Sequence, residues 1–122
     1  MNASNELEKE VYDYALKYNK KKDFVSMVCG AEFGSLRKCD KSGLQIDESS
    51  FYPKLKTRLL SFGNIGAKYN QTSIGCCAEV NASNEIYKQY NIELKEICLS
   101  NAYRPKTMQI REKCEVCKDI FL

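Results

Sequence analysis

The chain has 122 residues, of which 43% are hydrophobic and 29% are charged, and its formal net charge is +3. A single domain commonly has about 100–150 residues, and a domain of this size can bury a hydrophobic core without disulfides. The slight positive charge permits contact with nucleic acid without indicating it, because typical nucleic-acid-binding surfaces are more basic. No apolar run approaches the roughly 20 residues of a membrane-spanning helix. We therefore predict one domain over residues 1–122 and no contact with a membrane.

The chain contains seven cysteines and no histidine. Its N-terminus is polar and acidic and lacks the apolar region of a signal peptide, which predicts a cytoplasmic location. In a reducing compartment, thiols serve a metal site or the core in preference to disulfides. A metal site must therefore use Cys, Asp or Glu, and a general base must be a residue other than histidine.

The first half of the chain shows one helical and one extended pattern before Pro53. Residues 1–22 predict an amphipathic helix, because apolar residues recur on one helical face. These residues are Leu7, Val11, Tyr14, Ala15 and Tyr18. The apolar run Phe24–Ala31 predicts a buried strand, and a weaker strand is expected around 35–39 or 44–46. Cys29 and Cys39 are interpreted as small core residues in preference to a disulfide.

The second half alternates between helices, a strand and polar loops. Pro53 is expected to open a helix that ends at Ser61, and the Gly-, Asn-, Ser- and Thr-rich residues 63–75 predict a loop. A helix over Cys77–Tyr90 is expected to be followed by a strand centred on residues 97–99. A polar loop over 101–113 then leads to a last short helix, which Cys114 opens.

Two groups of residues in this half have the spacing of a metal site. Cys77 lies two residues before Glu79, and Cys114 and Cys117 form a Cys-x-x-Cys pair. Two cysteines three residues apart at the start of a helix lie on one side of its first turn, where the helix N-terminus favours thiolates. Cys77, at the start of another helix, can supply a third ligand. Three protein ligands leave the fourth tetrahedral position of Zn²⁺ for water.

Such a site can perform hydrolytic chemistry. Zinc lowers the pKa of the water that it binds, so that hydroxide is available near neutral pH. Glu79 would take the proton of this water and pass it to a ring nitrogen and then to the leaving amine. The net reaction is the deamination of an amino-substituted pyrimidine or purine. Arg104 and Arg111 are candidate cations to balance the negative charge of three thiolates.

Two other interpretations remain open. A structural zinc site has four closing ligands. A closed site of this kind, in a non-enzymatic zinc-stabilised binding module, could be formed by Cys76, Cys77, Cys114 and Cys117. Neighbouring side chains at a helix start point about 100° apart, so we expect Cys76 to pack and not to bind metal. The other interpretation is an exported, disulfide-bonded protein without metal. Cys98, in the middle of an apolar strand, is expected to be a core residue.

Residues 75–82, which read Gly-Cys-Cys-Ala-Glu-Val-Asn-Ala, together with 97–104 and 114–117, resemble the cytidine deaminase-like superfamily. The resemblance is strongest to the deaminase domains at the C-termini of bacterial polymorphic toxins, and it covers roughly residues 74–121. It implies an α/β fold in which a mixed β-sheet is flanked by helices. It also implies that zinc is bound by Cys77, Cys114 and Cys117 and that Glu79 moves protons. A toxin domain would be exported as part of a larger protein, with an immunity protein as its partner.

The chain departs from the family pattern at two places. Lys113 stands where the family usually has Pro, and the chain ends five residues after Cys117, whereas many members continue with further strands and a helix. The sheet would then be completed by the N-terminal half, by a partner chain, or not at all.

The family's free-nucleoside deaminases carry an Asn-x-Glu segment in an early strand, and no convincing match precedes Cys77. This favours as substrate a base in nucleic acid, with cytosine preferred over adenine, or another amino-substituted ring. Candidates to stack on such a base are Tyr69, Tyr103 and Phe62.

Overall fold

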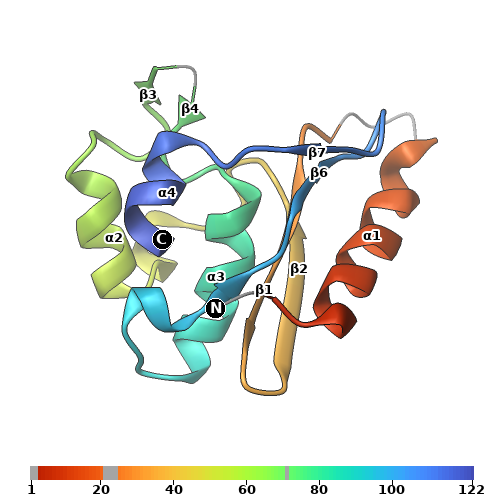
Figure 1. Ribbon diagram of the computed structural model, residues 1–122. Coiled ribbons are helices and arrows are strands. Elements are labelled where there is room, and N and C mark those ends of the chain that lie inside the picture. The colour runs from red at the N-terminus through yellow and green to blue at the C-terminus, as the bar shows by residue number, and fades with distance from the viewer. Residues whose placement is uncertain (1–2, 21–24, 71) are drawn as a thin grey trace.

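A central β-sheet separates one long helix from the other three α-helices of the described residues (Figure 1). The computed structural model describes residues 3–20, 25–70 and 72–122. The helix on one face is α1 (Asn5–Asn19); the other side carries α2 (Pro53–Leu60), α3 (Ala78–Gln89) and α4 (Glu115–Phe121). Two short 3₁₀ turns, η1 (Glu48–Ser50) and η2 (Leu94–Glu96), follow β2 and α3.

The sheet has the strand order β2-β1-β6-β7, with β5 paired to β1 beside β6. Its strands are β1 (Val28–Phe33), β2 (Leu36–Lys41), β5 (Cys98–Leu99), β6 (Ala102–Arg104) and β7 (Gln109–Arg111). Two further strands, β3 (Lys68–Tyr69) and β4 (Thr72–Ser73), form a separate hairpin. The predicted α/β architecture of a sheet flanked by helices is confirmed. The pairings of the described strands are all antiparallel, however, where we expected a mixed sheet. One of our three alternatives was that the N-terminal half completes the sheet. The N-terminal half does contribute to the sheet, because it supplies β1 and β2.

Helix α1 begins at a side-chain cap and lies very close to the sheet. The Ser4 hydroxyl accepts a hydrogen bond from the Leu7 backbone N–H at 3.1 Å, which satisfies an otherwise unpaired donor of the first turn. The residues that α1 buries are Leu7, Val11 and Ala15. Gly30 of β1 lies directly beneath them, and a Cβ there would lie 2.8 Å from Leu7 Cδ1 and closer still to Val11. This close approach therefore requires glycine.

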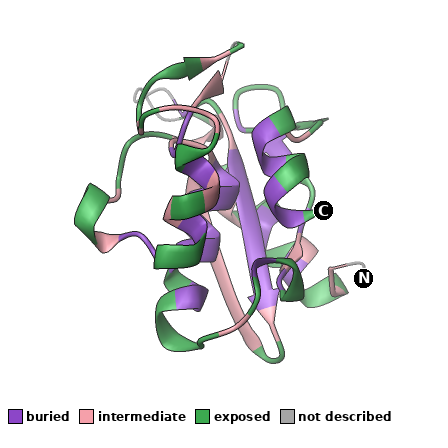
Figure 2. Ribbon diagram, turned by 90° about the vertical axis from the view of Figure 1, so that its left-hand side faces the viewer, coloured by how far each residue is buried: buried purple, intermediate pink, exposed green. Residues whose placement is uncertain are grey.

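Helix α3 lies at the centre of the other face and is buried along most of its length. Val80, Ile86 and Tyr87, which the sequence predicts for its buried side, all lie in the main hydrophobic cluster together with residues of α2 and α4. Buried residues line the inner sides of the helices and the middle of the sheet, and exposed residues lie on the outer sides (Figure 2).

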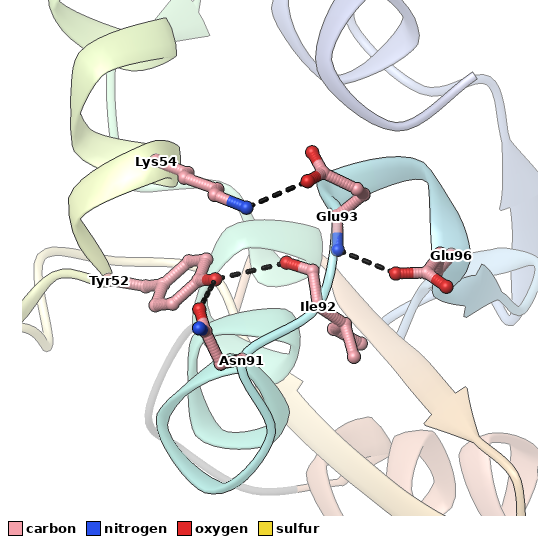
Figure 3. Close-up of polar contacts among 6 residues, drawn as sticks. All are labelled: Tyr52, Lys54, Asn91, Ile92, Glu93 and Glu96. Atoms are coloured by element: carbon pink, nitrogen blue, oxygen red, sulfur yellow. Dashed lines mark hydrogen bonds and ion pairs between the residues drawn. The ribbon is translucent and has the colours of Figure 1, made fainter.

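The C-terminal end of α3 is fastened to the N-terminal end of α2 (Figure 3). The Tyr52 hydroxyl donates to Asn91 Oδ1 at 2.7 Å and to the Ile92 carbonyl at 3.0 Å. The Lys54 ammonium forms an ion pair with Glu93 at 2.8 Å. These contacts lie at the end of α3 that is remote from Cys77.

Several predicted element boundaries change in the structure. The first strand begins at Val28 and extends to Phe33, and the expected start at Phe24 lies outside the described residues, as do residues 21–22 of the predicted first helix. The second strand is β2, near 35–39 and not 44–46. The predicted loop over 101–113 is wrong, because it contains the β6–β7 hairpin, and the predicted loop over 63–75 contains the β3–β4 hairpin. These strands have only two or three residues each, too few to show a period of two in the sequence.

Two cysteines outside the metal motif differ in their environments. Cys29 lies opposite Asp40 and is buried against Ala78, whereas Cys39 lies opposite Gly30 and packs beside α1. Because successive strand residues point to opposite faces, the thiols of Cys29 and Cys39 lie on opposite sides of the sheet and cannot form a disulfide. Cys98, expected in the core, is only half-buried in the short strand β5.

Candidate metal and catalytic site

Two helices begin at the same end of the molecule, and a cysteine precedes each of them. Cys77 is the N-cap of α3 (φ −71°, ψ 146°), and Cys114 is the N-cap of α4 (φ −69°, ψ 165°). The Cys117 backbone N–H donates to Cys114 Sγ at 3.5 Å, so that this sulfur takes the place of an ordinary capping oxygen. Unpaired N–H groups at a helix start stabilise a thiolate.

The sulfur atoms of Cys77, Cys114 and Cys117 all lie within 4.8 Å of one another. The Cys77 and Cys114 sulfurs are 3.4 Å apart. With Zn–S bonds of about 2.3 Å, sulfurs around a tetrahedral ion lie roughly 3.8 Å apart, so the cluster has the dimensions that such an ion needs. The structure thus brings together the three cysteines that the sequence identifies, and they are positioned to hold a metal ion.

Cys76 does not belong to this cluster among the described residues. Its sulfur lies 3.8 Å from the Ile74 carbonyl oxygen, at the side of the neighbouring loop. The three clustered sulfurs therefore have no fourth cysteine to close the coordination sphere in this conformation.

The hydrogen bonds among the three cysteines favour a thiolate at one of them. Hydrogen bonds from Cys117 and Cys77 hold the pKa of Cys114 far below its usual range. The pKa of Cys77 and the pKa of Cys117 are both raised, chiefly because each makes its hydrogen bond to Cys114 and also because each is buried. In the absence of metal, these hydrogen bonds thus favour Cys114 as the thiolate and Cys77 and Cys117 as its donors.

A cavity of about 720 Å³ opens beside the cluster. Cys77, Glu79 and Cys114 contribute to its wall, together with the hydroxyl-bearing residues Ser42 and Thr72. Sites for small molecules commonly have volumes of about 300–1,000 Å³, so this cavity is large enough for a small organic ring and its substituents.

Glu79, in the first turn of α3, is only 5% exposed and borders the cavity. Burial raises the pKa of its carboxyl group; the negative charge of Cys114 raises it further, and Lys113 opposes both effects. A carboxyl group whose pKa is shifted toward neutrality beside a cavity is suited to accept and return a proton. Glu79 therefore borders the same cavity as Cys77 and Cys114.

Lys113 makes a contact beside the site that the sequence reasoning missed, because Lys113 was considered only as a replacement for Pro. Its ammonium group donates to the Ser100 carbonyl oxygen at 2.9 Å, which holds the start of α4 against the segment between β5 and β6. Burial raises the pKa of the Cys29 thiol, and the charge of Lys113 opposes this rise. Of the two expected cations, Arg111 lines the cavity, whereas Arg104 is exposed on β6.

The segment after β2 forms the opposite wall, and α3 holds it in place. The Gly43 N–H donates to the Cys76 carbonyl oxygen at 2.8 Å. The Asn81 side-chain amide donates to the carbonyl oxygens of Lys41 at 2.8 Å and Gly43 at 3.0 Å. Asn81, two residues after Glu79, is thus a structural partner of the site that no local sequence signal identified.

The three candidate stacking residues lie in different places. Tyr69 lies in a small hollow beside Cys114 and Thr72, with its ring edge-on to Phe62 at 5.1 Å. Tyr103 packs on the α1 side of the sheet, edge-on to Tyr12 at 5.8 Å. Of the three, Tyr69 is therefore nearest to the cysteine cluster, and Tyr103 faces away from it.

No model of a known protein family matches the chain, and no curated protein or solved structure matches it either. The resemblance to the cytidine deaminase-like superfamily therefore stays a prediction that rests on the motif residues. None of the helices in the described part of the chain is long and apolar enough to cross a membrane.

Proposed function

We propose that the chain is a zinc-dependent hydrolytic deaminase that acts on a nucleobase, cytosine in preference to adenine, carried in nucleic acid. The observation that supports this most strongly is that the sulfur atoms of Cys77 and Cys114 and the carboxyl group of Glu79 border one cavity. Cys117 completes a set of three sulfurs with the spacing of a tetrahedral site. When bound there, zinc would act as a Lewis acid and lower the pKa of a water molecule.

The chain's own residues would carry out the remaining steps. Glu79 would accept a proton from the attacking water, deliver it to the ring nitrogen and return a proton to the leaving amine. Ser42 and Thr72 offer hydroxyl groups to the edge of the base, and Met27 and Ala78 offer apolar surface to its ring. The raised pKa of Glu79 supports this role, because burial makes its carboxylate a stronger base than that of an exposed glutamate.

The position of Cys76 favours an enzyme over the alternative of a non-enzymatic zinc module. A closed structural site needs four ligands, and the Cys76 sulfur lies beside the Ile74 carbonyl instead. A role as a toxin domain with an immunity protein is a narrower form of the proposal, and it rests on the motif resemblance alone.

The test is the substitution Glu79→Gln, with ammonia release measured on cytosine-containing single-stranded DNA, RNA and free nucleosides. We expect activity to fall by about 10²–10⁴-fold, the usual contribution of a general acid–base group, while the zinc content per chain stays unchanged. Glu115→Gln is the matched control, because Glu115 is exposed near Cys114 and bonds to Asn70 at 3.1 Å.

Three results would count against the proposal. Unchanged activity in Glu79→Gln would remove the proton-transfer role. Loss of zinc in the same variant would show that Glu79 is a ligand. Absence of zinc from reduced, freshly purified wild-type protein would reject the enzyme.

A further inference from the structure

A patch of aromatic and basic side chains lies where the C-terminal half of α1 meets the end of β2. It consists of Tyr14, Lys17, Tyr18 and Lys41, and we call it the α1–β2 patch. The two tyrosine rings are edge-on, with centroids 5.4 Å apart. The Lys17 ammonium lies 5.6 Å from the Tyr14 ring centroid, and the Lys41 ammonium lies 5.3 Å from that of Tyr18. Each ring therefore has a cation beside it.

The patch is joined to the cavity by a short, fixed piece of backbone. Lys41 is the last residue of β2, and the next two residues, Ser42 and Gly43, line the cavity. The Lys41 carbonyl accepts the Asn81 side-chain amide, and the Gly43 N–H donates to the Cys76 carbonyl. Figure 1 shows the C-terminal end of α1 and the N-terminal ends of α3 and α4 at the same end of the molecule. The patch and the cavity therefore adjoin along the chain at residues 41–43.

Positive charge continues from the patch along the cavity wall. Lys68 of β3 and Arg111 of β7 both line the cavity and are exposed. The acidic Glu112 also lies there, but it faces Lys118 at 3.7 Å. Asp40, next to Lys41, is half-buried and accepts a hydrogen bond from the Lys41 N–H.

Glu6, Glu8 and Glu10 lie in the first half of α1, whereas Asp13 directly precedes Tyr14 and is exposed at the edge of the patch. Two of them are engaged elsewhere: Glu8 accepts from the Asn101 N–H, and Glu10 pairs with Arg37. Lys17 is the basic residue of the last turn of α1. The last turn of α1 is therefore basic, with Asp13 one turn before Lys17.

Cations beside aromatic rings suit one class of polymer in particular. Proteins that bind single-stranded nucleic acid combine a basic track for the phosphates with aromatic rings on which unpaired bases stack. A duplex offers its phosphates but keeps its bases paired and stacked, and a free nucleoside has no backbone to reach the patch. We infer that the α1–β2 patch binds the backbone and an unpaired base of single-stranded nucleic acid and directs the strand to the cavity beside Glu79. This inference rests on the proposed function, which supplies the reason for delivering a base to that cavity.

The test is binding of a fluorescent single-stranded oligonucleotide of mixed sequence and about 15 nucleotides, near the upper site size of such proteins. Fluorescence anisotropy would be measured over a range of salt concentrations with wild type, Lys17→Gln/Lys41→Gln and Lys88→Gln/Lys95→Gln. Lys88 and Lys95 are exposed near the opposite end of α3, so the control pair changes net charge equally. Thermal melting would check that all three proteins are folded.

We expect the patch variant to reduce the slope of log binding constant against log salt by about 1.4, because each phosphate contact on a single strand contributes roughly 0.7. The control pair should keep the wild-type slope. The inference would be overturned if both variants reduced this slope equally. It would also be overturned if the wild-type protein bound the duplex of the same sequence more tightly than the single strand. If wild type binds no oligonucleotide, the inference is also overturned. Deamination of a free nucleoside would then retain the zinc-dependent deaminase but reject nucleic acid as its substrate. Patch-dependent binding without ammonia release on any substrate would instead retain the patch and reject the proposed function.

Discussion

The protonation state of the cysteine cluster predicts how many protons leave when zinc binds. In the metal-free chain, hydrogen bonds from Cys117 and Cys77 stabilise Cys114 as the thiolate, and the raised pKa values keep Cys77 and Cys117 protonated at neutral pH. Zinc binds the thiolate form of cysteine, so both thiols must lose their protons. We therefore expect the release of about two protons for each zinc ion bound, in place of about three for a set of ordinary thiols.

This stoichiometry fixes the sign and size of the pH dependence. Protons compete with zinc, so affinity must rise as the pH rises. With two protons released, the apparent binding constant should increase about hundredfold per pH unit, or roughly 2.7 kcal/mol at 1.36 kcal/mol per decade. Competition with a chromophoric chelator between about pH 6.5 and 8 measures the slope, and calorimetry in buffers of different ionisation enthalpy counts the protons directly.

Substitutions separate the ligands from the neighbouring thiol. Cys77→Ser removes one of the two protonated thiols, so proton release should fall to about one and the affinity should drop sharply. Cys76→Ser should behave like wild type, because the Cys76 sulfur lies beside the Ile74 carbonyl. Two results would contradict this reasoning. Release of about three protons for each zinc ion would show that Cys114 is protonated in the metal-free chain. Zinc binding that does not depend on pH would show that these sulfurs are not the ligands.

Two further predictions concern the scaffold. Gly30→Ala should lower the free energy of unfolding in urea by about 1–3 kcal/mol, because the new methyl group would collide with Leu7 and Val11. Adding Val11→Ala to this variant should cost less than Val11→Ala costs in the wild-type protein. Strictly additive effects of the two substitutions would refute the packing argument. Burial raises the pKa of Asp40, so its ionised form destabilises the native state, and stability should fall as the pH rises through that pKa. Asp40→Asn should therefore increase the free energy of unfolding at pH 7 by up to about 0.5 kcal/mol. This gain should disappear below about pH 4, where Asp40 is protonated in the unfolded state too. An equal gain at both pH values would contradict the prediction.

The sequence was informative where the signal is local. Helix α3 was predicted as Cys77–Tyr90 and is observed as Ala78–Gln89, because its apolar residues recur with helical spacing over many turns. The three cysteines could be grouped because two of them share one helical turn and the third begins another helix. The helix needed only the residues of one element, whereas the grouping of Cys77 with the other two cysteines also relied on the number of ligands in a zinc site.

The features that the sequence missed depend on contacts between distant segments. Lys113 reaches the carbonyl of Ser100, and Asn81 reaches the backbone of Lys41 and Gly43. Neither contact leaves a pattern along the chain, since it exists only after the sheet and α3 are assembled. The β6–β7 hairpin was missed for a related reason: β6 pairs with β1 through a single residue pair, Tyr103 with Val28, so its position is set by its neighbours and not by its own composition.

The two faces of the sheet have separate hydrophobic clusters, and this separation has an evolutionary consequence. Helices α3 and α4, which position the cysteines, pack in one cluster, whereas α1 packs in the other through Leu7, Val11 and Ala15. Substitutions on the outer surface of α1 can therefore accumulate without moving the three sulfurs or Glu79. A lineage built on this scaffold can change the outer surface of α1 while the three sulfurs and Glu79 stay in place, and a designer can vary the same surface for the same reason.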